Sequence, residues 1–399
     1  MRGPLNWLLQ IAAVTRFNLR SLPQRKGSSA TAMFGIAGVV AVMVSVLSIA
    51  HGIVRMMENS AAPGNVIVMR AGANTEMMSA LMGEATDIIA EGPGIARNEL
   101  GAMASPELFV VINLPMRSTG TDANVPMRGV QQQAFTVREG FRIVAGRMFE
   151  WGLNEVIVGA GAQHEFAGLE LGETIEVGRE AWRVVGVFEA NGGIAESEIW
   201  VDAAVLQPAY RRGNSFQSVF VRLDSPQDFA AFRDALATDP RLSVKVTSEQ
   251  DYYAEQSVTV YRLITVLGTL VAVIMGLGAV FGALNTMYTA TASRTREIAT
   301  LRALGFQAGP VVVSVLTESL LLALAGGAVG AALAWLAFDG FQAATLNWAS
   351  FSAMTFTFNV SPPLLVQGIV YALLIGLVGG LFPAVRAARQ PVAVALREL

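Results

Sequence analysis

Four apolar runs constrain this chain more than any other feature of its sequence. They are Ser28–Ala50, Leu263–Ala292, Ala308–Phe338 and Leu364–Val385, and the first holds 23 residues without a charge. A helix that crosses a bilayer needs about 20 predominantly apolar residues. The sequence therefore predicts an α-helical membrane protein with four transmembrane helices.

A long segment between the first two runs, residues 52–262, contains no stretch that could span a membrane. It holds 17 basic and 27 acidic residues, a net charge of −10, whereas the rest of the chain has 11 basic and 4 acidic residues, a net of +7. Basic residues are retained on the cytoplasmic side of a membrane, and an acidic segment is free to be exported. We expect residues 52–262 to form a large exported (periplasmic) domain, with both chain termini in the cytoplasm.

The remaining segments follow from this topology. Residues 1–27 carry five basic residues and no acidic one, and their apolar stripe predicts an amphipathic helix on the inner leaflet. A signal peptide is the alternative, but the apolar run that follows, over 28–51, is too long for one. Residues 293–307 form a cytoplasmic connection, 339–363 a short outer connection without lysine or arginine, and 386–399 a cytoplasmic tail.

Short periodic pieces of the exported domain predict a mixed α+β fold. Strands are expected over 65–70, 108–112, 155–158, 174–177 and 182–188, and a helix over 75–90 with buried Met77, Met78 and Met82. Alternatively, these methionines and Met103 line a hydrophobic substrate surface. Ser225 and Ser248 are each placed to cap the start of a helix. Since no helix breaker follows Ser248 before Leu263, we expect this second helix to run into the second span as a stalk; a bend near Ser257 is the alternative.

Several kinds of catalytic site are absent from the sequence. The chain has no cysteine and only two histidines, so we expect no disulfide and no zinc site. No GxxxxGK[ST] motif occurs, so the chain is expected to bind no nucleotide itself and to be non-catalytic. The acidic exported domain also disfavours nucleic acid as a partner.

The connection over 293–307 has the composition of a docking helix. Its polar residues are Arg294, Arg296, Glu297 and Arg302, its apolar residues are Ile298, Leu301, Leu304 and Phe306, and Gly305 is placed to end the helix. Because apolar residues at a membrane surface need a partner, we predict that this segment docks into a cytoplasmic protein. Alternatively, its arginines only fix the topology.

Two polar residues lie within the predicted spans. Glu318 falls roughly 15 Å into the third span, at about 1.5 Å per helical residue, and Asn285 lies near the end of the second. Charged groups in a membrane usually face protein or water. We expect Glu318 to pair with hydroxyls, with Asn285 or with a neighbouring helix end, rather than to act in a proton relay.

The layout and several motifs resemble the permease subunits of the MacB, LolC/LolE and FtsX group of ABC transporters. The motifs are Asn285-Thr286-Met287, the stretch from Arg294 to Gly305, Glu318, and the terminal Pro383–Arg389, Pro391 and Ala395-Leu396-Arg397. The run Leu171–Glu189 is similar to a segment of the family's periplasmic core. One departure is that the macrolide exporter fuses its ATPase to its N-terminus, and this chain carries no such domain.

The resemblance implies how such a chain works. A separate ABC ATPase dimer would bind ATP and Mg, dock on the helix over 293–307, and move the exported domain through the stalk. Ile298, Leu301 and Leu304 would insert into a groove of the ATPase, while the three arginines of the segment would meet its acidic rim or the lipid headgroups. A second permease copy, identical or homologous, would complete the machine in the bacterial inner membrane. The possible further partners are lipids, a periplasmic adaptor with an outer-membrane channel, or a lipoprotein substrate. Two alternatives stay open: a signalling permease that activates a cell-wall hydrolase, as FtsX does, and, less favoured, an intramembrane enzyme.

Overall fold

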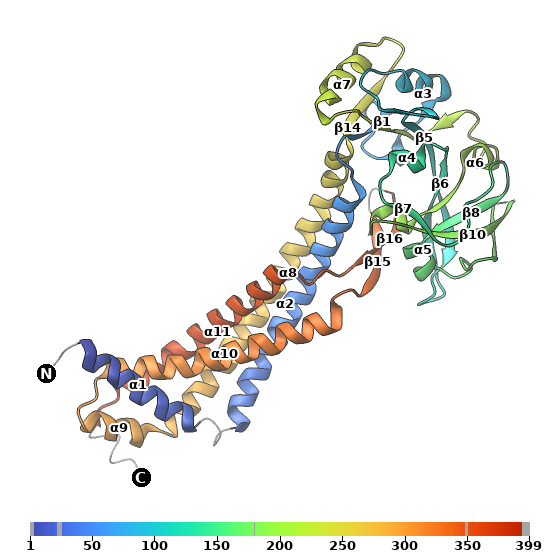
Figure 1. Ribbon diagram of the computed structural model, residues 1–399. Helices are drawn as coiled ribbons and strands as arrows, with labels where there is room; N and C mark the ends of the chain where they lie inside the picture. The colour runs from blue at the N-terminus through green and yellow to red at the C-terminus, as the bar shows by residue number, and fades with distance from the viewer. Residues whose placement is uncertain (1–3, 22–25, 179, 348–349, 393–399) are drawn as a thin grey trace. The chain divides into compact units, whose positions relative to one another are not determined.

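The computed structural model describes residues 4–21, 26–178, 180–347 and 350–392, and Figure 1 labels their elements. The chain divides into two compact units. The membrane unit comprises Met1–His51, Arg262–Phe341 and Asn359–Leu399, and the exported domain comprises Gly52–Tyr261 and Gln342–Phe358. Expectations for residues 1–3 and 393–399, at the two ends of the chain, fall outside the described residues.

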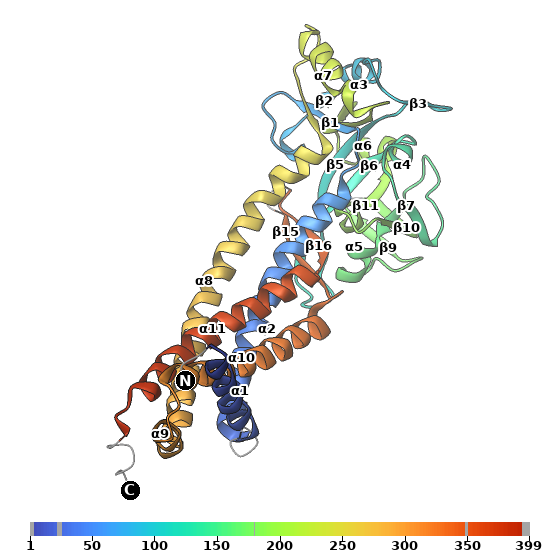
Figure 2. The ribbon, with the colours of Figure 1, turned by 60° about the vertical axis from the view of Figure 1, so that its left-hand side comes forward.

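Four helices in the described part of the chain are long and apolar enough to cross a membrane: α2 (Lys26–Ser60), α8 (Glu249–Ala292), α10 (Ala308–Phe338) and α11 (Pro362–Arg389). The predicted fold class, four membrane helices and a mixed α/β domain after the first, is confirmed. Figure 2 shows α8 as one uninterrupted helix, as the sequence predicted. Ser248 caps its start, because the Ser248 hydroxyl accepts a hydrogen bond from the Asp251 backbone at 3.0 Å.

Glycines allow the helices of the membrane unit to pack closely. A Cβ atom added to Gly330 of α10 would lie 2.3 Å from the carbonyl oxygen of Ala37 in α2. One added to Gly376 of α11 would lie 2.4 Å from the Cβ atom of Ala323 in α10. Small residues at these crossings bring the backbones together and permit van der Waals packing without a hydrophobic driving force.

The predicted N-terminal helix is present as α1 (Pro4–Ser21) and packs against α10. Val14 is buried, whereas Leu8 and Leu9 are exposed. The Gln10 side chain accepts a hydrogen bond from the backbone of Gln307 at 3.3 Å. The placement of α1 on the inner leaflet stays a prediction.

The exported domain is built on a ten-stranded mixed sheet in the order β14-β1-β13-β5-β6-β11-β8-β10-β7, with β9 paired to β10. The pairs β6–β11 and β8–β10 are parallel, and the other pairs in this sheet are antiparallel. Its strands are β1 (Asn65–Arg70), β5 (Ala104–Pro115), β6 (Asp122–Val130), β7 (Phe141–Gly146), β8 (Glu155–Gly159), β9 (Thr174–Val177), β10 (Glu180–Ala190), β11 (Ile199–Asp202), β13 (Ser218–Arg222) and β14 (Val244–Ser248). All five predicted strands are therefore confirmed.

Shorter elements complete the domain. The helices and 3-10 turns are η2 (Glu76–Met78), α3 (Gly83–Ala90), α4 (Ala134–Val137), α5 (Ala160–Glu165), η3 (Ile194–Ser197), α6 (Ala203–Ala209), η4 (Pro226–Asp228) and α7 (Phe229–Thr238). The small strands are β2 (Leu81–Met82), β3 (Arg97–Asn98), β4 (Gly101–Ala102) and β12 (Ser215–Phe216). One apolar core lies around β5, β6, β8, β10 and β11, and a second around β1, β13, α3 and α7.

The predicted helix over 75–90 is wrong in its first half. The chain there forms η2 and β2, and only α3 is an α-helix. Met77, Met78 and Met82 are exposed rather than buried. Helical periodicity in the sequence was outweighed by non-local contacts: β2 pairs with β12, and Glu76 turns inward to a buried arginine, Arg128.

The segment predicted as a short outer connection is a β-hairpin of the exported domain. Its strands are β15 (Gln342–Asn347) and β16 (Ser352–Thr357). The backbone nitrogen of Thr355 donates to the Ser197 hydroxyl at 2.8 Å, and the Asn124 amide donates to the carbonyl of Phe351 at 2.7 Å. Both contacts join residues more than 150 positions apart, and no local sequence pattern indicates them.

Candidate functional site

The predicted docking segment contains the short helix α9 (Thr295–Ala303), which starts two residues after α8 ends. Gly305 has a φ of +97°, which an L-residue with a side chain rarely adopts. The Gly305 nitrogen donates to the carbonyl of Arg302 and the Phe306 nitrogen to that of Leu301, each at 3.1 Å. This is a Schellman ending, and it confirms the predicted helix stop at Gly305.

Arg294, at the N-cap of α9, is not free to meet a partner as the sequence analysis expected. It is buried, and its Nη1 atom lies 3.4 Å from Oε2 of Glu318 in α10, which is also buried. Its Nε atom lies 3.9 Å from the Glu297 carboxylate. The expected partners of Glu318 were hydroxyls, Asn285 or a neighbouring helix end. Asn285 is exposed, whereas Arg294 lies at the start of the neighbouring helix α9. The turn between α8 and α9 brings Arg294 to a glutamate of α10 that lies 24 positions along the sequence.

Arg302 is also directed into the membrane unit. Its Nη1 atom donates to the carbonyl oxygen of Gln390, the C-cap of α11, at 2.8 Å. A cation placed there satisfies a helix-end carbonyl and interacts favourably with the helix dipole. The structure thus gives Arg302 a contact within the chain, and its expected contact with the acidic rim of a partner or with lipid headgroups stays a prediction.

The other predicted docking residues differ in exposure. Arg296 and Glu297 are exposed, and Leu304 is 73% exposed. Ile298, Leu301 and Phe306 are half-buried, and Ala299 between them is fully buried. Only one of the three predicted apolar anchors, Leu304, is thus fully presented for a partner. The docking role itself stays a prediction.

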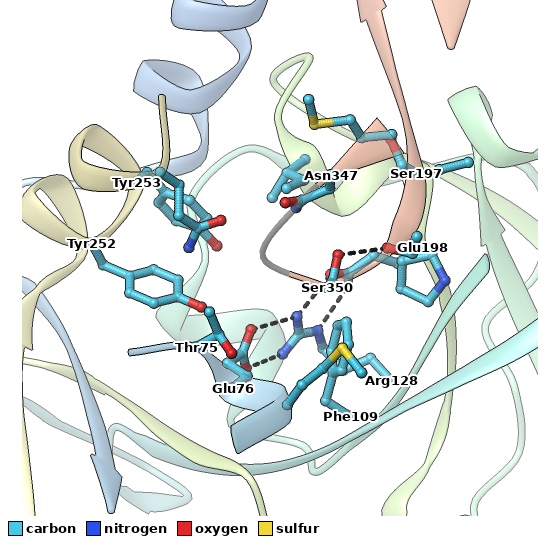
Figure 3. Close-up of a pocket in the computed structure, with 17 residues that line it drawn as sticks. Thr75, Glu76, Phe109, Arg128, Ser197, Glu198, Tyr252, Tyr253, Asn347 and Ser350 are labelled. Atoms are coloured by element: carbon cyan, nitrogen blue, oxygen red, sulfur yellow. Dashed lines mark hydrogen bonds and ion pairs between the residues drawn. The ribbon is translucent and has the colours of Figure 1, made fainter. Parts of the chain in front are cut away.

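A second charged site, which sequence reasoning missed, lies inside the exported domain (Figure 3). Arg128 of β6 is buried and makes ion pairs with Glu198 at 2.7 Å, Glu76 at 2.8 Å and Glu107 at 2.9 Å. Glu76 is on η2, Glu107 on β5, and Glu198 precedes β11, so one guanidinium joins four elements. The available signal was a charge within a strand: Glu107 directly precedes the apolar run Leu108–Ile112.

Every carboxylate around Arg128 has a further donor. Glu107 also pairs with Arg138, Glu76 accepts from the Ser218 hydroxyl at 2.6 Å, and Glu198 accepts from the Trp200 indole at 2.7 Å. Buried charges are tolerated only when such hydrogen bonds satisfy them. This network therefore fixes the relative positions of the strands that supply it.

The network also determines protonation. Burial alone would raise the pKa of Glu76, but the Arg128 charge and hydrogen bonds, with help from Ser218, lower it below the ordinary value of 4.5. Burial would likewise lower the pKa of Arg128, and the charges of Glu198, Glu76 and Glu107 raise it well above its ordinary value. Glu76 and Arg128 are consequently both ionised at neutral pH.

The start of α8 adjoins this network within the exported domain. Tyr252 and Tyr253 are buried and line a cavity of about 30 Å³ together with Glu76, Arg128 and Glu198. A cavity of this size holds about one water molecule. The start of α8 therefore packs closely against the Arg128 network.

Comparisons with known proteins give a consistent result. A family model described as MacB-like periplasmic core domain matches residues 29–239, and one described as FtsX-like permease C-terminal matches residues 269–392. The macrolide export ATP-binding/permease protein MacB 1/2 of Paracoccus denitrificans is 27% identical over 410 residues, which cover 98% of this chain and 59% of that protein. The ABC transporter permease YknZ of Bacillus subtilis is 25% identical over 57% of each chain.

Among solved structures, the periplasmic region of MacB from Actinobacillus actinomycetemcomitans is similar to this chain at 13% identity, with a TM-score of 0.37. The match covers 52% of this chain and 97% of that one. Of the MacB relatives from Paracoccus denitrificans, Aeromonas hydrophila and Bordetella avium, this chain spans 59%, 45% and 61% of the length.

Proposed function

This chain belongs to the MacB-like and FtsX-like family of ABC transporter permeases, and we propose that it passes motion from an ABC-type ATPase to its own exported domain. One observation carries this proposal. Helix α8 runs unbroken over 44 residues, from inside the exported domain to a point two residues before α9. A force applied at α9 would reach the domain through a single continuous element.

The N-terminal end of α8 is suited to this role because hydrogen bonds and packing fix it within the exported domain. Glu249, its first residue, is 1% exposed and accepts a hydrogen bond from the backbone of Ala62 at 3.0 Å. Ala62 is the second residue after the end of α2, so this hydrogen bond joins the ends of both helices in the domain. Tyr252 and Tyr253 pack beside the Arg128 network, which is itself rigid. Rotation or bending of α8 would therefore displace the domain instead of being absorbed at the junction.

The proposed machine contains further subunits. An ATPase dimer, which we expect on a separate chain, would bind ATP and Mg, and this chain would contribute no catalytic residue. A second permease copy would pack on α8, whose most apolar stretch is only 17% buried, against 33–39% for the other three spans. Gly278 and Gly282 of α8, in GxxxG spacing, have nothing within 4 Å among the described residues. Such spacing favours close helix pairing in membranes.

We place the protein in the inner membrane with both termini in the cytoplasm. The support is the charge distribution, because 11 of the 15 charged residues outside Gly52–Arg262 are basic. Export is the favoured direction of transport, since relatives that cover 98% and 95% of this chain are named as macrolide export proteins. The identity of the co-purifying proteins will show whether the partner is an efflux adaptor, a lipoprotein or a cell-wall hydrolase.

The test uses the exposed leucine of the docking segment. The full-length protein and a Leu304→Asp variant are each solubilised gently from native cells, and co-purifying ATPase is measured. Leu100→Asp, a change at an equally accessible leucine of the exported domain that is 56% exposed, is the matched control. Removal of an apolar anchor at an interface costs roughly 1–4 kcal/mol, or about a 5- to 800-fold loss of affinity.

We expect the ATPase to be retained by the parent and by Leu100→Asp and to be lost from Leu304→Asp. Equal retention in all three proteins would exclude α9 as the docking site. An absence of ATPase from the parent preparation would overturn the proposed function altogether.

A further inference from the structure

Both ends of α9 are tied to the membrane unit by arginine side chains. Arg294 at its start reaches Glu318 of α10, and Arg302 in its last turn reaches the carbonyl of Gln390 at the end of α11. The two ties go to two different helices, α10 and α11, which pack against each other along their length. Two attachment points on a nine-residue helix restrict both its tilt and its rotation.

Separating the ion pair between Arg294 and Glu318 is energetically unfavourable. Arg294 and Glu318 are 5% and 4% exposed, so neither charge is solvated by bulk water. Separating a buried pair leaves charge in a low-dielectric environment, which is unfavourable in a soluble core and more so within an apolar span. Any tilt of α9 that pulled Arg294 from Glu318 would meet this penalty.

The second tie depends on geometry. The Gln390 carbonyl is at a helix end, where no backbone donor of the same helix can satisfy it. The planar guanidinium of Arg302 supplies the donor and places a positive charge at the negative end of α11. Arg302 therefore joins the last turn of α9 to the fourth span.

We propose that Arg294 and Arg302 are positioning residues that fix the orientation of α9 on α10 and α11, so that these three helices move as one rigid body. This inference rests on the proposed function, because it explains how motion at α9 reaches the third and fourth spans. It also assigns the opposite face of α9, with exposed Arg296, Glu297, Thr300 and Leu304, as the face that contacts the ATPase.

The absence of cysteine allows a direct measurement of this orientation. Nitroxide labels are attached at Thr300→Cys on α9 and Leu321→Cys on α10, both exposed, and the label-to-label distance distribution is recorded for the permease alone. The parent should give a single narrow distance. Glu318→Gln and Arg302→Gln should each lose that single distance and give a broad distribution. Arg296→Gln, at an exposed arginine of the same helix, is the control and should keep it.

A variant with exchanged charges tests whether the effect depends on the ion pair itself or only on packing around these residues. The exchange Arg294→Glu with Glu318→Arg should restore the narrow distance that Glu318→Gln loses. A narrow distance in Glu318→Gln and Arg302→Gln, or a folded exchange variant that stays broad, would overturn the positioning role. If the exchange variant does not fold, the two single variants decide the question.

The two hypotheses can fail separately. Co-purification of the ATPase with unlabelled protein tests the proposed function, and the distance distribution of the permease alone tests the positioning role. If the parent binds no ATPase but Glu318→Gln and Arg302→Gln show the predicted broadening, the proposed function is overturned and the positioning role of the two arginines stands.

Discussion

Replacement of Arg128 by methionine should severely destabilise the exported domain. Arg128 makes five hydrogen bonds to three buried carboxylates. After Arg128→Met, Glu107 keeps Arg138, but Glu76 and Glu198 keep only the neutral donors Ser218 and Trp200. Two carboxylates would then be buried without a cation.

The expected magnitude follows from the protons that these carboxylates must bind. Each tenfold change in a proton equilibrium is worth about 1.4 kcal/mol, so neutralising one glutamate of ordinary pKa at pH 7 costs about 3.5 kcal/mol and two cost about 7 kcal/mol. Breaking a buried pair in other proteins costs about 3–5 kcal/mol. For a domain of this size, a loss of that order lowers Tm by at least about 6 °C.

The dependence of stability on pH should have opposite signs in the parent and in Arg128→Met. In the parent, the pKa of Glu76 is lowered, so its contribution is present above the ordinary value of 4.5 and is lost as pH falls below it. In Arg128→Met, burial without the cation raises the pKa of Glu76. The folded state then binds more protons than the unfolded state, and stability decreases as pH rises from about 5 to 7.

The assay is thermal unfolding of the full-length protein in detergent at pH 5 and pH 7, followed by tryptophan fluorescence. The control is Arg142→Met, which removes an exposed arginine, 70% exposed, from its pair with Glu189. Exposed pairs contribute about 0–1 kcal/mol, so this change should lower Tm only slightly. The reasoning is refuted if Arg128→Met is no more destabilising than Arg142→Met, or if raising the pH from 5 to 7 does not lower the Tm of Arg128→Met relative to that of the parent.

Two further predictions test the packing of the hairpin β15–β16 and the end of α9. A Ser197→Cys, Thr355→Cys pair should form a disulfide on mild oxidation, because the two hydroxyl oxygens lie 2.9 Å apart; two thiols that stay reactive toward a maleimide would show that the hairpin β15–β16 does not pack on η3. Gly305→Val should strain the end of α9, since φ there is +97°, at a cost of about 1–3 kcal/mol. Amide exchange at Phe306 should then accelerate, whereas Gly278→Ala, within a regular helix with open space beside it, should leave that rate unchanged.

The sequence alone determined the elements whose signals are local. Long uncharged runs specify membrane helices wherever they fold, because unsatisfied backbone groups are not tolerated in lipid. The continuity of α8 followed from a capping serine at 248 and the absence of a breaker before the span. The end of α9 followed from Gly305, since glycine tolerates the left-handed backbone that a helix stop requires.

The sequence also identified the kinds of residue in the docking segment, but it did not show which way their side chains point. Arg294, Arg296 and Arg302 look alike along the chain, yet Arg294 pairs with Glu318, Arg302 caps α11, and Arg296 is exposed. An arginine near a membrane surface can point to lipid, to a partner or back into its own protein. Only the turn between α8 and α9 and the position of α10 decide among these.

The tertiary structure decided everything that depends on residues distant in sequence. Glu76, Glu107, Arg128 and Glu198 form one network because strand order brings four elements together. The hairpin β15–β16 belongs to the exported domain because of contacts to Ser197 and Asn124. Local patterns fix which backbone a segment prefers, whereas buried charges and strand partners are specified only by the packing that removes them from water.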